Sequence, residues 1–123
     1  MVAYNFKSQF ADLVRQGEKC QTIRATGKRR HAQVGDRLQL YTGMRTKSCK
    51  KLADAICLGS SSIQMRMSGV GLLIFENYYL LTLHEMVELA RADGFTEDPL
   101  NEFIQFFGPR MPFSGVLITW ARL

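Results

Sequence analysis

The chain has 123 residues, of which 46% are hydrophobic and 22% charged, which suffices for one buried core and excludes a wholly disordered chain. Its longest apolar run, residues 70–75, is far too short to span a membrane, and the N-terminus lacks the features of a secretory signal. Three cysteines without a paired spacing predict a reduced setting. We therefore expect a soluble, cytoplasmic protein, with a single domain over residues 1–123.

Charge is unevenly distributed along the chain, although the net charge is only +5. Between Arg15 and Lys51 the sequence contains eleven Lys and Arg residues but only two acidic residues. Between Glu85 and Glu102 it contains six acidic residues and one basic residue, Arg91. Such a distribution suits a cationic surface that meets a phosphate backbone. It suits two solvated faces that keep the protein in solution equally well.

The first half of the chain alternates predicted helix, strands and polar loops. A helix from Phe6 is predicted by apolar residues at helical spacing, and Gly17 is a suitable left-handed cap for its end. The strands expected next are residues 20–25 and 37–42. Two basic loops, residues 26–33 and 43–51, flank the second of these strands.

The second half is predicted to contain short strands and then two helices. Strands are expected at residues 52–58, 63–68 and 70–75, and a final strand at 113–123. Thr82 can cap a helix that Gly94 ends, and Asp98-Pro99 is a strong start for the next helix. This order indicates an α+β domain, a small curled sheet or barrel with helices packed at its ends. The expected core comprises Leu38, Leu40, Ile56, Met65, Val116, Ile118 and Trp120 from strands, and Phe10, Leu13, Val87, Phe103 and Phe107 from helices.

The common cofactor and metal motifs are missing from the sequence. No phosphate-binding glycine loop and no Cys-x-x-Cys pair is present. His84 and Glu88 stand four apart on a predicted helix, where an exposed polar face explains them better than a metal site. We therefore expect neither a metal nor a cofactor.

The most informative segment is Gly17–Arg24, at the predicted junction of helix and strand. Thr22 and Arg24 have the same parity in the strand and project from one face, and Lys19 immediately precedes it. A lysine beside a hydroxyl can hold an anionic intermediate or, when buried, act as a base. A solvated lysine, a β-favouring threonine and a surface arginine would give the same pattern.

In context, the segment resembles the ASCH family of PUA-like domains. The pattern Gly-x-Lys-x-x-Thr-Ile-Arg follows an amphipathic helix, and Gly35-Asp36-Arg37-Leu38 then opens a strand. Further supporting segments are Leu40–Gly43, Ala90–Phe95, Phe106-Phe107 and Gly115–Trp120. The resemblance extends over essentially the whole chain, and the order and spacing of its motifs are more specific than any one of them.

The resemblance implies a PUA-like small β-barrel with a cleft that takes RNA or a modified nucleoside. Some small bacterial members resemble amidohydrolases that remove the acetyl group of N4-acetylcytidine. Carried onto this chain, their catalytic lysine is Lys19 and their threonine is Thr22. Their glutamate falls on Asp93, whose side chain is one methylene shorter. Thr22 would attack, Lys19 would take its proton or hold the oxyanion, and Asp93 would give a proton to the leaving amine.

Ligand contacts are expected from Arg24 and from the basic loops with their flanking residues. The loops are predicted to form one cationic rim. The residues expected to bind the ligand are Arg24, Arg29, Arg30, Tyr41, Arg45 and Lys47, with Lys28, Lys50 and Lys51 completing the rim. These residues serve a non-catalytic RNA-binding module as well as an enzyme, so the sequence leaves both functions open.

Overall fold

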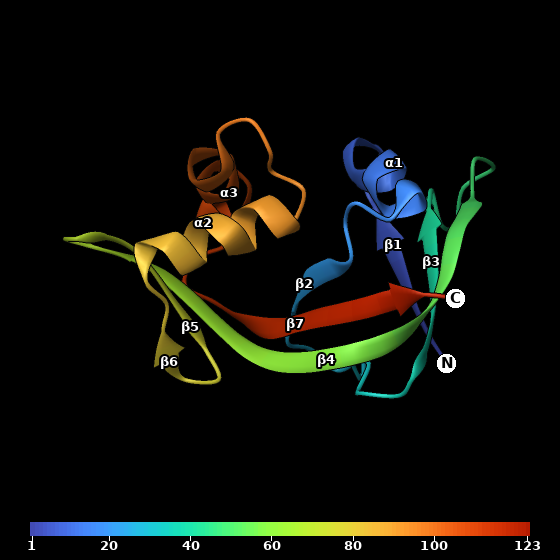
Figure 1. Cartoon of the computed structure of the whole chain (residues 1–123), viewed down its shortest axis with the longest axis horizontal. Helices are drawn as coiled ribbons and strands as arrows, with labels where there is room; N and C mark the ends of the chain where they lie inside the picture. Colours follow the sequence, from blue (N-terminus) through green and yellow to red (C-terminus); the bar gives the residue numbers. More distant parts are fainter.

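Seven strands and three α-helices make up the protein, and the structure, a computed structural model, describes residues 1–123. The α+β class expected from the sequence is confirmed. Figure 1 shows the three helices on one side of a long, curved sheet. The strands are β1 (Val2–Phe6), β2 (Gln21–Ala25), β3 (Arg37–Thr42), β4 (Lys50–Ser68), β5 (Gly71–Glu76), β6 (Tyr79–Leu80) and β7 (Phe113–Arg122). The helices are α1 (Ser8–Gln16), α2 (Leu83–Ala92) and α3 (Pro99–Phe107), followed by a 3₁₀ turn, η1 (Gly108–Arg110).

The sheet is built around β4, the longest strand. β4 pairs with β3 along its first part, with β7 along its middle and with β5 along its end, all antiparallel. β1 adds to β3 in parallel, and β2 adds to β7. β1, β2 and β6 therefore each end a branch of the sheet, and each has one edge without a partner strand.

The sheet does not close into a barrel, because β1 and β2 do not pair. Arginine side chains satisfy free carbonyls of β1 where a neighbouring strand would otherwise do so. Arg24 Nη2 donates to the Asn5 carbonyl at 2.6 Å, and Arg29 Nη2 donates to the Ala3 carbonyl. The closed barrel expected from the sequence is thus replaced by an open seam that side chains bridge.

Two local predictions need correction. The helix expected from Phe6 begins at Ser8, because Val2, Tyr4 and Phe6 alternate inward as strand β1. The strands predicted at 52–58 and 63–68 are one strand, because residues 59–62 also pair with β7. The alternation shifts where β4 bulges opposite Leu40 and Tyr41 of β3, so that Leu52 is buried and then Ala55 and Cys57, not Ile56. β4 has a second bulge between Cys57 and Gly59, where Leu58 is exposed.

The helix boundaries follow the predicted capping residues. Thr82 accepts a hydrogen bond from the backbone of Glu85, whose side chain accepts one from the backbone of Thr82, a capping box. α3 begins at Pro99 after Asp98, as predicted. No helix has the length and apolar character needed to cross a membrane.

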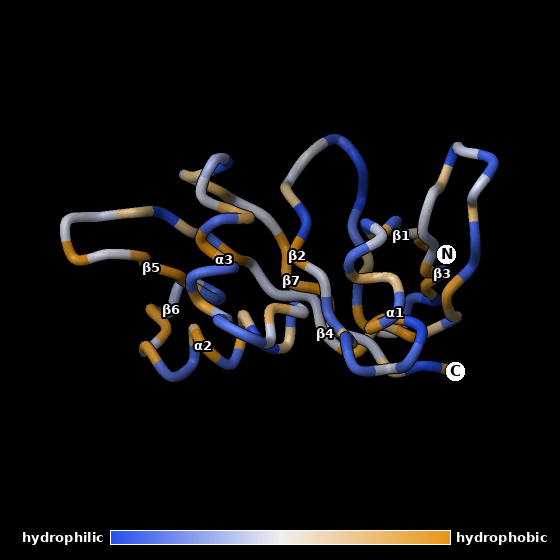
Figure 2. The backbone as a smooth tube through the Cα atoms, turned by 90° about the horizontal axis from the view of Figure 1, so that it is seen from above, coloured by the Kyte–Doolittle hydropathy of each residue, from blue (hydrophilic) through white to orange (hydrophobic).

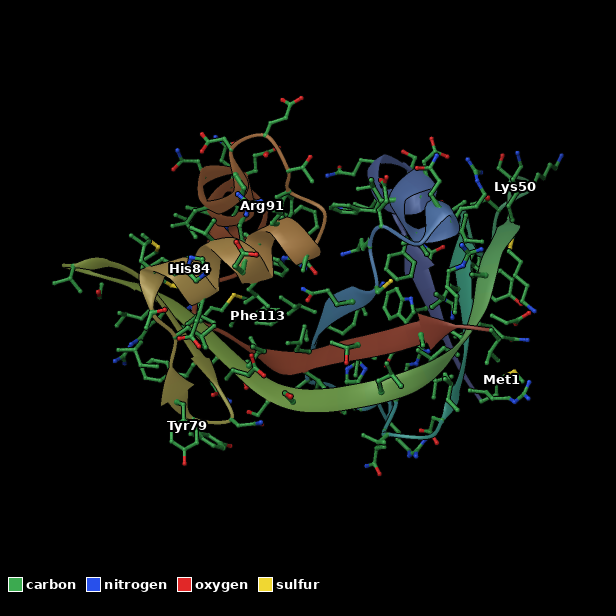
Figure 3. All side chains as sticks on the ribbon, in the orientation of Figure 1. Met1, Lys50, Tyr79, His84, Arg91 and Phe113 are labelled. Atoms are coloured by element: carbon green, nitrogen blue, oxygen red, sulfur yellow. The ribbon has the colours of Figure 1, made fainter.

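A chain of aromatic rings joins the helices to the sheet. Phe10 of α1 packs edge-on against Phe95 and Phe106, and Phe107 of α3 packs against Phe113 of β7 at 5.5 Å between ring centres. Figure 3 places Phe113 between the helices and the sheet. Of the predicted core residues, most are buried, and those that are only half-buried are Leu13, Ile56, Val87 and Val116.

Candidate functional site: a cationic pocket at the open seam

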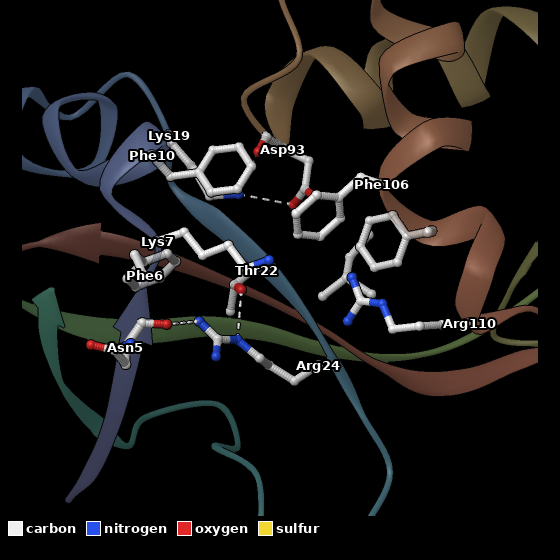
Figure 4. A pocket seen from close by; sticks show the side chains of 12 residues that line it. Asn5, Phe6, Lys7, Phe10, Lys19, Thr22, Arg24, Asp93, Phe106 and Arg110 are labelled. Atoms are coloured by element: carbon white, nitrogen blue, oxygen red, sulfur yellow. Dashed lines mark hydrogen bonds and ion pairs between the residues drawn. The ribbon is translucent and has the colours of Figure 1, made fainter. Parts of the chain in front are cut away.

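A pocket of about 250 Å³ opens at the seam between β1 and β2 (Figure 4). Its walls come from β1 and β2, which do not pair with each other, from α1 and from the ends of α2 and α3. Its lining residues are Asn5, Phe6, Lys7, Phe10, Lys19, Thr22, Ile23, Arg24, Asp93, Phe106, Phe107 and Arg110. The three residues predicted as catalytic, Lys19, Thr22 and Asp93, thus line one pocket with Arg24, and the only side-chain hydrogen bond among the three joins Lys19 and Asp93.

Lys19 is placed by the end of α1. Gly17 ends the helix with φ of 82°, and the Lys19 backbone N–H then donates to the Leu13 carbonyl at 3.0 Å. The chain turns directly into β2, which directs the Lys19 side chain inward, where only 3% of the residue is exposed. Its ammonium lies 4.9 Å from the centre of the Phe10 ring.

Asp93 reaches the pocket from the C-terminal end of α2. Lys19 Nζ lies 3.0 Å from Asp93 Oδ1 and also donates to the Asp93 backbone carbonyl. Gln21 Nε2 donates to the same carboxylate oxygen at 3.2 Å. Lys19 therefore forms a buried ion pair and at the same time satisfies a carbonyl at the negative end of the helix dipole.

Gly94 makes this approach of α2 to α1 possible. Its φ of 109° suits glycine, and a Cβ atom at this position would lie 2.9 Å from Phe10. Both features hold Asp93 against the end of α1. The predicted helix stop at Gly94 is therefore also a determinant of the site.

Thr22 and Arg24 project from β2 as the strand parity predicted. Arg24 Nε donates to Thr22 Oγ1 at 2.9 Å, while its Nη2 donates to the Asn5 carbonyl across the seam. The guanidinium lies about 5 Å from the ring centres of Tyr4 and Phe6. Thr22 is 4% exposed, and its hydroxyl accepts the bond from Arg24 but donates none.

Burial shifts the charged groups of the pocket toward their neutral forms. Desolvation lowers the pKa of Lys19, against the opposing attraction of Asp93. Desolvation likewise raises the pKa of Asp93, although Lys19 and the hydrogen bond from Gln21 oppose this. One proton can therefore move between the two groups at lower free energy than between the same groups in water.

The sequence did not predict Lys7 and Arg110 as site residues. Lys7 Nζ lies 5.0 Å and Arg110 Cζ 4.8 Å from the centre of the Phe106 ring at the pocket. Both side chains are exposed, and neither makes an ion pair or a side-chain hydrogen bond. Neither stands in a motif, because they precede α1 and end η1 as ordinary polar residues of connecting segments.

The remaining predicted ligand-binding residues do not line the pocket. Tyr41 bonds Gln39 on β3, Arg30 pairs with Asp36 at 3.0 Å, and Arg29 bridges the seam. Arg45 and Lys47 are exposed in the loop that follows β3.

The expected single cationic rim is not found at the pocket, because no residue of either basic loop lines it. The two basic loops leave opposite ends of β3, a six-residue strand roughly 20 Å long. Figure 2 shows both loops as hydrophilic segments that extend separately from the rest of the chain. His84 is exposed on α2 (Figure 3). The chain contains no group of three or more His, Cys, Asp or Glu residues that could hold a metal ion.

No family model matches the chain, and neither a curated protein nor a solved structure is significantly similar to it. Any functional proposal therefore rests on the chemistry of the pocket. Its four cationic side chains and one carboxylate favour an anionic or electron-rich ligand. Its buried lysine, carboxyl group and hydroxyl are the groups that acyl transfer requires.

Proposed function

We propose that the protein is an ASCH-family amidohydrolase that removes the acetyl group of N4-acetylcytidine. The observation that carries this proposal is the buried Lys19–Asp93 pair in the same pocket as the buried hydroxyl of Thr22. The pocket volume, about 250 Å³, is close to the lower limit of roughly 300 Å³ for small-ligand pockets. That size suits one nucleoside. The fold is in our proposal a PUA-like barrel left open at the β1–β2 seam.

The reaction begins with the Thr22 hydroxyl. Its oxygen attacks the acetyl carbonyl carbon, and its proton passes to the Lys19 amine in the form that burial favours. Arg24 donates a hydrogen bond to the Thr22 hydroxyl oxygen. The hydroxyl oxygen is therefore the acceptor in this bond, and the hydroxyl proton can be transferred to Lys19. The positive charge of Arg24 also stabilises the alkoxide as it forms.

The second half of the cycle returns the proton. The bond between the carbonyl carbon and N4 breaks, and N4 takes a proton from the Lys19–Asp93 pair to leave as the amine of cytidine. Water then attacks the acetyl ester on Thr22, the bond between the acetyl carbon and the Thr22 oxygen breaks, that oxygen takes back a proton, and acetate and a second proton are released. The lowered pKa of Lys19 and the raised pKa of Asp93 favour this exchange, because the two groups share a proton.

The test is chromatography of N4-acetylcytidine incubated with purified protein, which should show equal amounts of cytidine and acetate. Thr22→Ala and Lys19→Ala should each lower turnover by roughly 10³-fold or more, because residues that act as one unit fail together. Thr22→Ser should retain activity, since it keeps the hydroxyl. Asp93→Glu tests whether the longer carboxylate of the family raises turnover. Thr96→Ala, on an exposed threonine, is the matched control.

A second function, non-catalytic RNA binding, is favoured by the surplus of cations in the pocket. In that case the wild type would release no cytidine. It would instead bind RNA with an affinity that falls steeply with salt concentration. That pair of results would reject the amidohydrolase and leave an RNA-binding ASCH domain.

A further inference from the structure

The mouth of the pocket holds two cations, Lys7 and Arg110, that form no ion pair with any carboxylate. Lys7 and Arg110 come from segments about a hundred residues apart, yet both lie about 5 Å from the centre of the Phe106 ring. Figure 4 shows them reaching into the pocket from opposite sides, with Arg24 beneath. Repulsion among three cations in one place raises the free energy of the empty site.

The deeper cations of the pocket are already engaged. Lys19 is paired with Asp93 at 3.0 Å. Arg24 donates to Thr22 and to the Asn5 carbonyl, so its guanidinium holds the seam and the hydroxyl together. The sequence had suggested Arg24 as a ligand contact, but its hydrogen bonds within the protein leave the binding of a phosphate to Lys7 and Arg110.

We propose that Lys7 and Arg110 form a phosphate subsite, so that the ligand is a cytidine nucleotide and not a free nucleoside. This inference rests on the proposed function, in which the pocket receives the cytidine. A planar arginine fork and a mobile lysine ammonium are the usual partners of phosphate oxygens. Both side chains are exposed at the mouth, so the phosphate faces solvent while the base and its acetyl group face Thr22.

Two sources supply the same phosphate chemistry, a terminal 5′-monophosphate and an internal phosphodiester of RNA. The position at the mouth accommodates either. Comparing cytidine 5′-monophosphate with a cytidine dinucleotide that carries only a phosphodiester distinguishes them. Tighter binding of the monophosphate points to nucleotides, and equal or tighter binding of the dinucleotide points to RNA.

The test is calorimetric binding of cytidine, cytidine 5′-monophosphate and inorganic phosphate to the whole chain. The monophosphate should bind about 10- to 100-fold more tightly than cytidine, as expected for charge-assisted hydrogen bonds. Lys7→Gln and Arg110→Gln should each reduce this advantage, and the double variant should abolish it. Arg37→Gln and Arg66→Gln, on exposed arginines outside the pocket, should leave it unchanged.

The inference is overturned if the monophosphate binds no tighter than cytidine, if its advantage survives in the double variant, or if none of the three ligands binds. Binding requires no turnover, so the two proposals fail separately. A protein that prefers the monophosphate but releases no cytidine from N4-acetylcytidine retains the phosphate subsite and loses the amidohydrolase. A protein that hydrolyses N4-acetylcytidine but does not prefer the monophosphate retains the amidohydrolase and loses the phosphate subsite.

Discussion

Lys19 has a structural role as well as the proposed chemical one. Its ammonium satisfies the Asp93 carbonyl at the end of α2 and pairs with the Asp93 carboxylate, so it ties the helix to the β2 strand. A purely structural lysine would show the same contacts. Turnover of N4-acetylcytidine distinguishes the two roles, because only a catalytic Lys19 shares its phenotype with Thr22.

The pKa directions of this pair predict a pH dependence of stability. Lys19 has a folded pKa below its ordinary 10.5, so between those values the unfolded chain binds more protons and stability rises with pH. Asp93 has a folded pKa above its ordinary 3.8, so between those values the folded protein binds more protons and stability rises as pH falls. The free energy of unfolding, relative to the double variant Lys19→Met/Asp93→Asn, should therefore be lowest between the two windows.

Urea unfolding of both proteins at a series of pH values measures this difference. The double variant serves as the reference because it lacks both titrating groups while every other ionisable residue is kept. A difference that stays flat from acid to alkaline pH, or that peaks at neutral pH, would contradict the assigned directions of both shifts.

At the scale of the element, the junction between α1 and the end of α2 decides whether the site forms. Gly94 combines a positive φ with a close approach to Phe10. Gly94→Ala should lower the free energy of unfolding by about 1–3 kcal/mol, because it adds both strain and a clash. Chemical denaturation of the variant measures the loss.

Alanine substitutions at two other glycines distinguish the effect of backbone strain from the effect of the clash with Phe10. Gly35 has φ of 91° with open space around it, and Gly27 has neither a positive φ nor a near neighbour. Gly35→Ala should cost about 1 kcal/mol from strain alone, and Gly27→Ala should stay within about 0.5 kcal/mol. Equal losses at Gly94 and Gly35 would show that the contact with Phe10 adds nothing.

At the scale of the whole molecule, the sheet depends on the inward face of β3. Leu40 is fully buried between the layers. Leu40→Asp should lower the free energy of unfolding by roughly 3–5 kcal/mol, because it buries a carboxyl group without a partner. Thermal and urea unfolding measure this loss.

Leu58 provides a control with the same substitution. It lies at the bulge of β4 with 59% of its surface exposed, so Leu58→Asp should change stability by no more than about 0.5 kcal/mol. Wild-type stability in Leu40→Asp would reject the assigned inward face of β3. A large loss in Leu58→Asp would instead place the bulge in the core.

The open seam is likewise a property of the whole molecule. A closed barrel would pair β1 with β2 and leave no space between them, whereas here residues of both strands line the pocket. Arg24 and Arg29 satisfy β1 carbonyls in the absence of a partner strand. The unpaired edges are therefore stabilised without closing the site.

Local sequence signals determined much of the secondary structure. Gly17, Thr82, Gly94 and the Asp98-Pro99 pair marked helix ends correctly, because caps and breakers act within a few residues. Alternation placed Thr22 and Arg24 on one face of β2, and the structure brings them into one hydrogen bond. The pattern around Lys19 and Thr22, together with the family expectation for Asp93, pointed to three residues that the structure places in one pocket.

Only the tertiary structure decided which of these residues meet and what joins them. Lys19 and Asp93 are 74 positions apart, and Lys7 and Arg110 are further apart still. Short-range propensity and periodicity carry no information about such distances, because contacts of this kind depend on how strands pair and helices dock. The same limit explains the unpredicted strand β1, the joined strand β4 and the two basic loops, which share a composition but lie at opposite ends of β3.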